Sequence, residues 1–345
     1  MTHPLKKILI IQTAFLGDVV LATSLIEQVH EKFPQSELHV LVRQGAETLV
    51  QFNPHIKKIL VWEKKKNKFK NLFIILKSIR HERYSAILNV QRFFSSGLLT
   101  AFSLAKITIG FKSNPWSFYF SNTVAHQIPM LHDEKILHEV QRNFMLLQEL
   151  ISAVGMQKVI VPEAKSIKPK LYFGHDAFQM TNVEKKPYVV IAPASIWFTK
   201  QWPKEQWIQF IQNLQKEISV FLVGGPDDYN LCQEILVSSQ RPLIVNTCGK
   251  LSLLQTALLM KNAQRVVCND SAPSHLASAV NAPQTVIFCS TTTDFGFGPL
   301  SDDSKVMHIE NLSCRPCGIH GYKSCPQKHF RCALEIDAQL VAKSV

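Results

Sequence analysis

Long apolar segments are missing from this chain. None of its apolar runs approaches the roughly 20 residues that a membrane-spanning helix needs. The N-terminal run that follows Lys6 and Lys7 is interrupted by Gln12, Asp18 comes soon after it, and no convincing small-residue cleavage site follows. This pattern does not fit a signal peptide. We therefore expect a cytoplasmic protein.

Signatures of common cofactors are missing as well. No Gly-x-Gly-x-x-Gly follows a predicted strand, which disfavours a nicotinamide cofactor. No Asp-x-Asp occurs, so chemistry without a bound metal fits better than chemistry bridged by Mg²⁺. We expect no cofactor. Low-complexity tracts are also absent, and a composition of 46% hydrophobic and 19% charged residues indicates a globular α/β protein rather than a disordered one.

Acidic residues are scarce in one segment of the first half. Between Lys57 and Arg83 ten side chains are Lys or Arg and only two, Glu63 and Glu82, are acidic, so this basic segment carries +8 of the net charge of +12. Such a segment attracts nucleic acid, acidic phospholipid or a phosphorylated glycolipid. The alternative is a solvated lysine-rich loop and helix. Nucleic acid is disfavoured, because a reader motif and interleaved aromatic residues are missing.

Short apolar runs alternate with amphipathic helical segments in both halves of the 345-residue chain, which is long enough for two domains. The expected strands are 8–11, 38–42, 59–62, 86–90 and 107–111 in the first half, and 188–192, 220–223, 243–245, 265–268 and 285–288 in the second. The expected helices include 20–31 and 69–80, and others begin near Pro203, Asp227, Ser252 and Ala272.

This alternation predicts an α/β fold of parallel sheets covered on both faces, hence two Rossmann-like, doubly wound domains. The polar, Lys-rich and Pro-containing stretch 165–186 is the expected connection, and we place the domains at 1–175 and 176–345. Ligands of such sheets bind at the carboxyl ends of the strands. The residues that follow each strand are therefore the candidates for a functional site.

The stretch 263–290 is the most informative one. An apolar run ends at Asn269-Asp270-Ser271, small residues then begin a helix, and a second apolar run follows. This strand–turn–helix–strand unit aims backbone N–H groups outward from a helix N-terminus, where a phosphate or diphosphate binds well. The alternative is an ordinary crossover in which Asp270 and Ser271 only cap the helix.

A carboxylate follows the first predicted strand. Gly17 permits a tight turn there, and Asp18 lies at or just inside the start of the next helix. A carboxylate at this place can accept a proton from a hydroxyl held in the site, so Asp18 is a candidate general base. The alternative is that Asp18 only interacts with the helix dipole, which would also lower its pKa and make it a weaker base.

Two more strand ends in the second half carry polar residues. Ser195 and Lys200 follow the strand 188–192, where a lysine can neutralise a departing diphosphate. Asp227 and Asp228 follow a glycine turn at the end of the next strand. Their carboxylates either contact a ribose or cap the following helix.

Four motifs occur in order along the chain: Gly17-Asp18-Val19-Val20 with a following Leu-Ala-Thr, Lys200-x-Trp202-Pro203, Gly224-Gly225-Pro226, and Asn269-Asp270-Ser271-Ala272-Pro273-Ser274-His275-Leu276-Ala277. Together they closely resemble the bacterial ADP-heptose:lipopolysaccharide heptosyltransferases, the glycosyltransferase family 9 enzymes of GT-B fold. The resemblance spans about Lys7 to Leu334. The family usually has Asp-Ser/Thr-Gly where Ala272 stands here, and the alanine leaves less room for a donor sugar to approach the backbone.

The resemblance implies an inverting transfer of heptose from ADP-heptose in a central cleft that the two domains face. Asp18 would take the proton of the acceptor hydroxyl, and Lys200 with Ser195 would hold the diphosphate. Phosphate, ribose and adenine would meet further donor-site residues, namely Gly225, Asp227, Asp228, Leu251, Asp270, Ser271, Ala272, Ser274 and His275. His275 is equally well explained as a buried, hydrogen-bonded histidine. The alternatives are a family member that uses another nucleotide sugar and a nucleotide-sugar epimerase of the same fold.

The resemblance also implies the acceptor, a phosphorylated, Kdo-bearing inner-core lipopolysaccharide at the cytoplasmic face of the inner membrane. The basic segment would bind this anion through Lys64, Lys65 and Lys66, with Arg92 and Lys112 as further contacts. We expect a peripheral membrane enzyme that does not bind nucleic acid.

Four of the eight cysteines cluster near the C-terminus, and the other four read as small core residues. Cys314-x-x-Cys317, followed by Cys325 and Cys332, could bind zinc, with His320 or His329 as a substitute ligand. The alternative is a set of thiols, reduced or oxidised. The same cluster looks like the tail of heptosyltransferase II-type members of the family.

Overall fold

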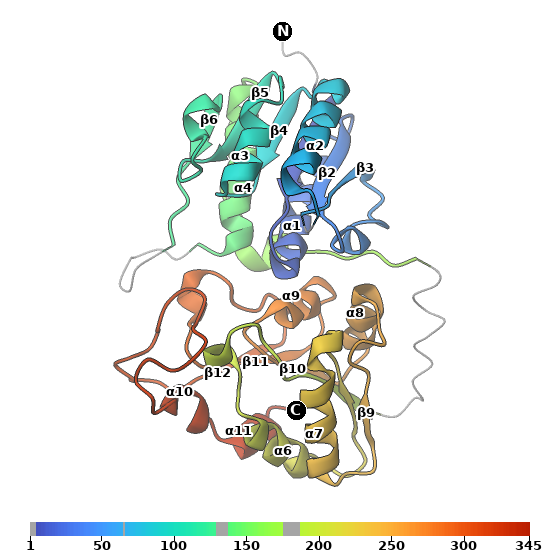
Figure 1. Cartoon of the computed structure of the whole chain (residues 1–345), viewed down its shortest axis with the longest axis vertical. Helices are drawn as coiled ribbons and strands as arrows, with labels where there is room; N and C mark the ends of the chain where they lie inside the picture. Colours follow the sequence, from blue (N-terminus) through green and yellow to red (C-terminus); the bar gives the residue numbers. More distant parts are fainter. Residues whose placement is uncertain (1–4, 65, 129–136, 175–186) are drawn as a thin grey trace. The chain divides into compact units, whose positions relative to one another are not determined.

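The computed structural model describes residues 5–64, 66–128, 137–174 and 187–345. The chain divides into two compact units, Met1–Tyr172 and Phe173–Val345 (Figure 1). This division falls three residues before the boundary that we expected from the sequence. No helix in the described ranges is long and apolar enough to cross a membrane.

The first unit is built on a six-stranded parallel sheet of order β3-β2-β1-β4-β5-β6. Its strands are β1 (Lys7–Gln12), β2 (Glu37–Arg43), β3 (Ile56–Trp62), β4 (Ala86–Asn89), β5 (Ile107–Phe111) and β6 (Asn122–Val124). Its helices are α1 (Leu16–Lys32), α2 (Lys68–Glu82), α3 (Phe94–Ala101) and α4 (Glu139–Ala153), and a short 3-10 turn, η2 (Ser117–Tyr119), precedes β6.

The second unit repeats this architecture with the order β12-β11-β10-β7-β8-β9. The strands are β7 (Tyr188–Ala192), β8 (Ser219–Leu222), β9 (Ile244–Asn246), β10 (Arg265–Asn269), β11 (Gln284–Ile287) and β12 (Ser304–Met307). The helices are α6 (Lys204–Asn213), α7 (Tyr229–Ser239), α8 (Leu253–Lys261), α9 (Ala272–Ala279), α10 (Arg331–Leu334) and α11 (Ala338–Ala342). The predicted α/β class with two doubly wound parallel sheets is thus confirmed.

The central strands form because their residues are apolar on both faces. Ile8, Leu9, Ile10 and Ile11 in β1 are all completely buried, as expected for a parallel strand that is covered by helices on each side. In contrast, β6 and β12 were not expected from the sequence. They are short edge strands with polar residues, so they lack the apolar run that marks a central strand.

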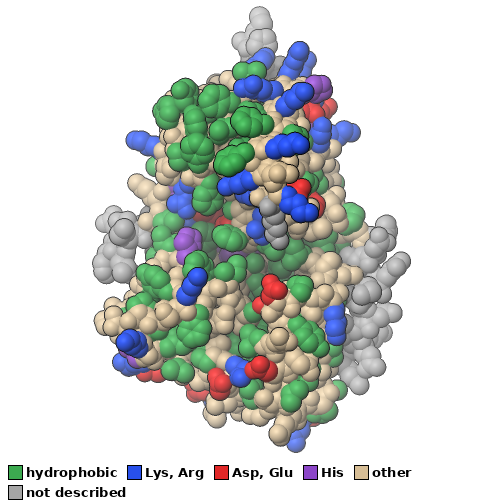
Figure 2. All heavy atoms as spheres, in the orientation of Figure 1, with side chains coloured by type: hydrophobic (Ala, Val, Ile, Leu, Met, Phe, Trp, Pro, Cys, Tyr) green, Lys and Arg blue, Asp and Glu red, His purple; other side chains and the backbone are tan. Residues whose placement is uncertain are grey.

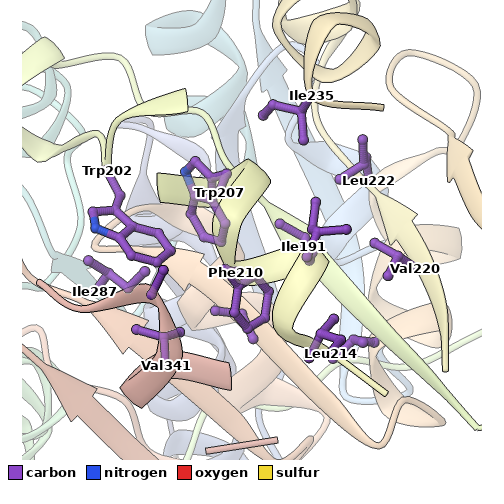
Figure 3. Packing of buried hydrophobic residues seen from close by; sticks show 14 of the residues in the cluster. Ile191, Trp202, Trp207, Phe210, Leu214, Val220, Leu222, Ile235, Ile287 and Val341 are labelled. Atoms are coloured by element: carbon purple, nitrogen blue, oxygen red, sulfur yellow. The ribbon is translucent and has the colours of Figure 1, made fainter. Parts of the chain in front are cut away.

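The core of the second unit centres on the aromatic side chains of α6 and of the loop before it (Figure 3). Trp202 and Trp207 are buried and pack edge to face, with ring centroids 4.9 Å apart, and Phe210 lies beside them. Val341 of α11 joins the same cluster. Full burial of such side chains contributes roughly 1.5–3 kcal/mol each, which fixes the loop between β7 and α6 against the sheet.

Each sheet has a point where the strand order reverses. In the first unit it lies between β1 and β4, and in the second between β7 and β10. The loops that leave neighbouring strands there run to opposite faces of the sheet, which opens a crevice at the carboxyl ends of the strands. Asp18 follows β1, whereas Lys200 and Asp270 follow β7 and β10. The topology therefore carries these predicted residues to the crevices.

Candidate active site

Asp18 lies in the first turn of α1, directly after β1. The N–H of Phe15 donates to Asp18 Oδ2 at 3.2 Å, so the carboxylate closes the N-terminus of the helix. This is the capping contact that the sequence left as the alternative to a catalytic role. The two roles are compatible, because one hydrogen bond leaves the rest of the carboxylate for another partner.

Burial raises the pKa of Asp18 to about 6, and the charge of Glu139 acts in the same direction. The Phe15 N–H and the cations Arg92 and Arg43 oppose this shift without cancelling it. The alternative of a weaker base is therefore not met: the N–H at the helix terminus does lower the pKa of Asp18, but desolvation outweighs it. A carboxylate with a pKa near neutrality is a better general base than one with an ordinary pKa.

Three cations belong to the crevice around Asp18. Arg43 ends β2 with its guanidinium 5.8 Å from the centre of the Phe15 ring. Lys64 follows β3 and donates from Nζ to the carbonyl of Thr13 at 2.6 Å. Arg92, which is exposed, follows β4. Lys64 and Arg92 were predicted from the sequence, but Arg43 was missed, although its place at a strand end was a usable signal.

None of the remaining predicted acceptor residues has a described contact with Asp18. Lys66 is exposed just before α2, and Lys112 is exposed after β5, two strands away from β1. No described contact joins either of them to Asp18. Lys65 lies outside the described residues.

Several polar atoms at the carboxyl ends of β2 and β4, the neighbours of β1, lack partners among the described residues. Gln91 accepts a hydrogen bond from the Thr13 hydroxyl at 2.7 Å through Oε1. Its Nε2, the Nδ2 of Asn89 and the Nε of Arg43 are buried without a hydrogen-bond partner among the described residues. Each such atom costs roughly 1–3 kcal/mol while it remains unpaired. Three of them at one strand-end crevice indicate a site that is built for a polar ligand.

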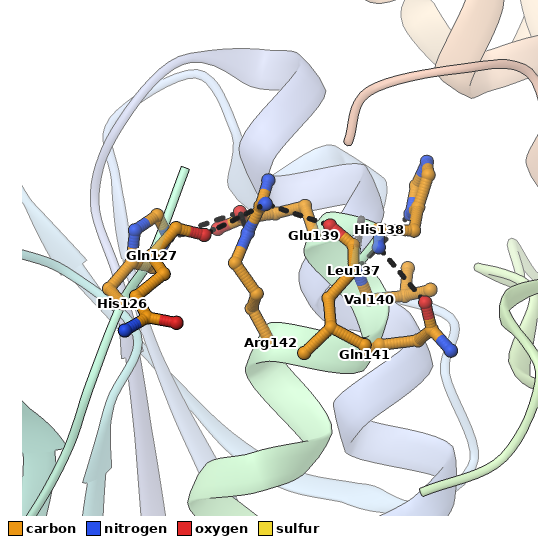
Figure 4. Close-up of polar contacts among 8 residues, drawn as sticks. All are labelled: His126, Gln127, Leu137, His138, Glu139, Val140, Gln141 and Arg142. Carbon is orange, nitrogen blue, oxygen red and sulfur yellow. Dashed lines mark hydrogen bonds and ion pairs between the residues drawn. The ribbon is translucent and has the colours of Figure 1, made fainter. Parts of the chain in front are cut away.

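Glu139, which the sequence analysis missed, forms a buried polar network at the start of α4 (Figure 4). Its Oε2 accepts from Arg142 Nε at 2.7 Å and contacts His126 Nε2 at 3.2 Å. Burial raises the pKa of Glu139, but hydrogen bonding by His126 and the charge of Arg142 hold it below its ordinary value. Glu139 is therefore ionised at neutral pH and acts on Asp18 as a fixed negative charge.

Replacing Glu139 by glutamine should lower the pKa of Asp18, because the substitution removes a negative charge that raises it. An NMR titration of the Asp18 carboxyl should show the shift. The variant should also lose about 3–5 kcal/mol of unfolding free energy in denaturant, because Arg142 is left buried without its ion pair. Glu149→Gln, further along α4, is the control. An unchanged Asp18 pKa in folded Glu139→Gln would contradict the coupling.

Lys200 and Asp270 meet at the crevice of the second unit. Lys200 Nζ lies 2.6 Å from Asp270 Oδ2, and the Thr291 hydroxyl donates to the same oxygen at 2.6 Å. The side chains of Lys200 and Asp270 are only 14% and 8% exposed. The turn carboxylate therefore holds the lysine in place instead of capping α9.

The turn before α9 offers two backbone donors. The Asp270 N–H donates to Ile287 and the Ser274 N–H to Ser271, whereas Pro273 has none. The N–H groups of Ser271 and Ala272 make no hydrogen bond within the described part of the chain. Ser271 occupies the N-cap position but its side chain makes no capping bond. A lysine and two N–H groups at a helix N-terminus form a site for an anion such as a diphosphate.

Residues 73–325 match the sequence model of glycosyltransferase family 9 (heptosyltransferase). This chain belongs to glycosyltransferase family 9. It is 26% identical to lipopolysaccharide heptosyltransferase 3 of Escherichia coli over 287 residues, which cover 80% of this chain and 82% of the relative.

Solved structures of the family share the fold. The structure of the E. coli ADP-heptose lps heptosyltransferase II has a TM-score of 0.77 at 20% identity and covers 98% of this chain and 97% of its own. The E. coli heptosyltransferase WaaC with ADP-2-deoxy-2-fluoro heptose has a TM-score of 0.71 at 17% identity and covers 98% of both chains. These similarities confirm the GT-B fold that the motifs implied, and the family assignment confirms that the chain is a glycosyltransferase.

In this family 9 enzyme the turns after β8 and β9 are joined. The N–H of Gly249 donates to the carbonyl of Gly224 at 3.0 Å, and a Cβ at Gly249, whose φ is +73°, would lie 3.0 Å from Pro226 Cα. The N–H of Gly225 donates to Asp228 Oδ2 at 2.8 Å, so Asp228 is used in its own turn. Asp227 is exposed and makes no described contact, so its carboxylate is open to a ligand.

Three further residues were predicted to bind the donor, and their surroundings suit donor binding to different degrees. Ser274 is buried and donates from Oγ to Gln284 Oε1 at 3.2 Å, and its N–H is also used, so it is the least suited. His275 is buried and its ring packs near Phe297, with ring centroids 6.5 Å apart. Leu251 is half-buried in the loop after β9, beside the joined turns.

The cysteine-rich tail of the glycosyltransferase supports the Lys200 loop. The N–H of Tyr322 donates to Thr199 Oγ1 at 2.7 Å, the N–H of Thr199 donates to the carbonyl of Tyr322 at 3.1 Å, and the N–H of Cys317 donates to Ser290 at 2.9 Å. Ser290, which follows β11, in turn donates from Oγ to Thr199 Oγ1 at 3.0 Å. The tail and the loop after β11 therefore both contact the residue next to Lys200. The sequence predicted this tail as a metal site or a set of thiols, and its contact with the Lys200 loop was not predicted.

The four tail cysteines are free thiols in the structure. Burial raises the pKa of Cys317, and it raises the pKa of Cys332 to about 12. Cys314 Sγ lies 3.8 Å from His329 Nε2. Among the described residues no group of three or more His, Cys, Asp or Glu side chains is arranged to hold a metal ion.

Proposed function

We propose that this enzyme transfers a heptose from ADP-heptose to the phosphorylated inner core of lipopolysaccharide, with inversion at the anomeric carbon. The observation that carries the proposal is Asp18, a carboxylate at the carboxyl end of β1 whose pKa of about 6 suits a general base at neutral pH. The chain's membership of a heptosyltransferase family supports the sugar class.

The second unit binds the donor in this proposal. Lys200 and the N–H groups of Ser271 and Ala272 hold the diphosphate, and Ser195 lies on the same loop as Lys200. Asp227 contacts the ribose. Leu251 and Gly225 lie on the joined turns that receive the nucleoside. The solved WaaC structure contains ADP-2-deoxy-2-fluoro heptose, which supports an ADP-linked heptose as the donor class.

The reaction is a single displacement at the anomeric carbon. The acceptor hydroxyl forms a new C–O bond there, its proton passes to Asp18, and the bond from the anomeric carbon to the diphosphate oxygen breaks. ADP leaves with the bonding electron pair, and Lys200 and the two amides stabilise its charge. The proposal uses no cofactor.

The first unit binds the acceptor in this proposal. Arg43 and Arg92 act on Asp18 and Lys64 interacts with Arg43, and these three cations match the phosphates of an inner-core oligosaccharide. Lys66 and Lys112 are more distant cations for the same anion. The relatives named as lipopolysaccharide and lipooligosaccharide heptosyltransferases support this acceptor. Because that acceptor is lipid-linked, we place the enzyme at the cytoplasmic face of the inner membrane as a peripheral protein.

Assays of ADP release test the proposal. We expect release with ADP-heptose only when a deacylated, phosphorylated inner-core acceptor is present, and a product whose anomeric configuration by NMR is opposite to that of the donor. Dephosphorylated acceptor should show a raised KM, because it no longer attracts the cations around Asp18. Preference for a different ADP- or GDP-sugar would contradict the assigned donor, and retention of configuration would contradict the mechanism.

A further inference from the structure

The first unit exposes a cluster of large apolar side chains on α2, on the loop after α3 and on η2. We call it the aromatic face: Phe69, Phe73, Ile74, Leu104, Phe118 and Tyr119. Phe69 is 73%, Leu104 75% and Phe118 74% exposed. Figure 2 shows hydrophobic side chains gathered on this unit with Lys and Arg side chains beside them. Side chains so exposed contribute little to the core, so another role must account for them.

Contacts between its elements make the aromatic face one surface. Arg80 Nε of α2 donates to the carbonyl of Phe102, at the end of α3, at 2.7 Å. The Phe102 ring lies 5.9 Å from that of Tyr119, and the Tyr119 ring lies 4.4 Å from that of Phe118. The turn η2 is itself fixed, because Asn114 Nδ2 donates to the carbonyl of Gln91 at 3.0 Å. The exposed rings are therefore held by a rigid frame.

Charge in the part of the sequence that carries the aromatic face is mostly of one sign. Residues 64–132 contain eleven Lys and Arg and a single acid, Glu82. That acid is already paired, because it lies 2.7 Å from Lys7 Nζ and 2.6 Å from Lys58 Nζ. On α2, Lys70 and Lys77 alternate with the exposed rings, while Leu72, Ile75, Leu76 and Ile79 face the core. The expectation that aromatic residues are not interleaved with this charge was wrong.

We propose that the aromatic face docks the enzyme on an anionic phospholipid bilayer. Apolar side chains enter the interface between headgroups and acyl chains, and Lys70 and Lys77 contact anionic headgroups, each cation contributing about 1 kcal/mol. A second copy of the chain is disfavoured, because two such faces repel one another. Single-stranded nucleic acid would stack on the exposed rings but leave the aliphatic Ile74 and Leu104 uncovered, whereas a bilayer covers both kinds of side chain.

Docking here rests on the proposed function, since a lipid-linked acceptor lies in such a bilayer, but its test does not need the reaction. Vesicles of phosphatidylglycerol and phosphatidylethanolamine should co-sediment the full-length protein, whereas phosphatidylcholine vesicles should not, and salt should weaken the binding. Phe73→Ser with Phe118→Ser should lower the partition coefficient at least about tenfold. Lys77→Glu should lower it less. The control, Val237→Ser with Leu340→Ser, removes exposed apolar side chains from the second unit and should leave the partition coefficient unchanged.

Two activity assays separate this inference from the proposed function. With deacylated acceptor in solution, the Phe73→Ser and Phe118→Ser enzyme should keep its kcat, and circular dichroism should show an unchanged Tm. With acceptor embedded in anionic vesicles, its KM should rise. Absence of vesicle binding by the wild type, or binding to RNA in preference to vesicles, would overturn the docking surface. Vesicle binding without heptose transfer to soluble acceptor would instead overturn the proposed function.

Discussion

Replacing Asp18 by asparagine should abolish heptose transfer while ADP still binds. The amide keeps the shape of the side chain but cannot accept the proton of the acceptor hydroxyl. General-base catalysis typically contributes 10²- to 10⁴-fold, and kcat should fall by at least about this factor. Stopped ADP-release assays give kcat, and calorimetric titration gives the Kd of ADP. This Kd should change less than about twofold, because we propose that the nucleotide binds to the second unit.

The pH profile tests the same assignment. The pKa of Asp18 is about 6, so kcat of the wild type should fall as the pH drops below 6, because the protonated carboxyl is not a base. The control is Glu31→Gln, which removes an exposed acid from the same helix and should leave kcat and its pH profile unchanged. Turnover of Asp18→Asn at a near-normal rate would show that another group is the base.

The same substitution should stabilise the first unit at neutral and higher pH. The folded-state pKa of Asp18 is raised, so the folded protein favours the neutral carboxyl and is penalised when it ionises. The penalty is absent below the unfolded pKa near 3.8 and complete above about 6, where it amounts to at most about 3 kcal/mol. In denaturant unfolding at pH 8, Asp18→Asn should therefore have a higher free energy of unfolding than the wild type. This difference should disappear at pH 4.

Replacing Lys200 by alanine should weaken both ADP binding and turnover. The lysine is nearly buried beside the N–H groups of Ser271 and Ala272, where its charge is screened little by water. Loss of one such donor to a leaving group typically lowers kcat by about 10²- to 10³-fold. The Kd of ADP should rise by about tenfold or more.

A second set of variants distinguishes binding from structure, because Lys200→Ala also leaves Asp270 without its cation. Lys200→Ala combined with Asp270→Asn removes the uncompensated charge and should recover the Tm but not kcat. The control is Lys204→Ala, four residues away, which breaks only a surface ion pair with Glu234. It should change neither kcat nor the Kd of ADP. If the double variant also recovered kcat, the role of Lys200 would be only to neutralise Asp270.

The sequence determined much of the fold. Each expected strand is present within three residues at either end, because both faces of a central parallel strand must be apolar and such runs are easily seen. Helix starts were less certain: α1 begins at Leu16 rather than near Val20. Its first turn is defined by the Phe15–Asp18 contact, which does not appear in an apolar pattern.

The sequence by itself also determined which polar residues follow the strands, and parallel topology then carries Asp18, Lys200 and Asp270 to the two crevices. Only the tertiary structure decided how those residues behave. Glu139 is far from Asp18 in the sequence, yet its charge raises the pKa of the Asp18 carboxyl. In the same way Tyr322, from the cysteine-rich tail, supports the loop that carries Lys200. A pKa depends on burial and on charges that distant segments bring together, and neither is encoded in a local pattern.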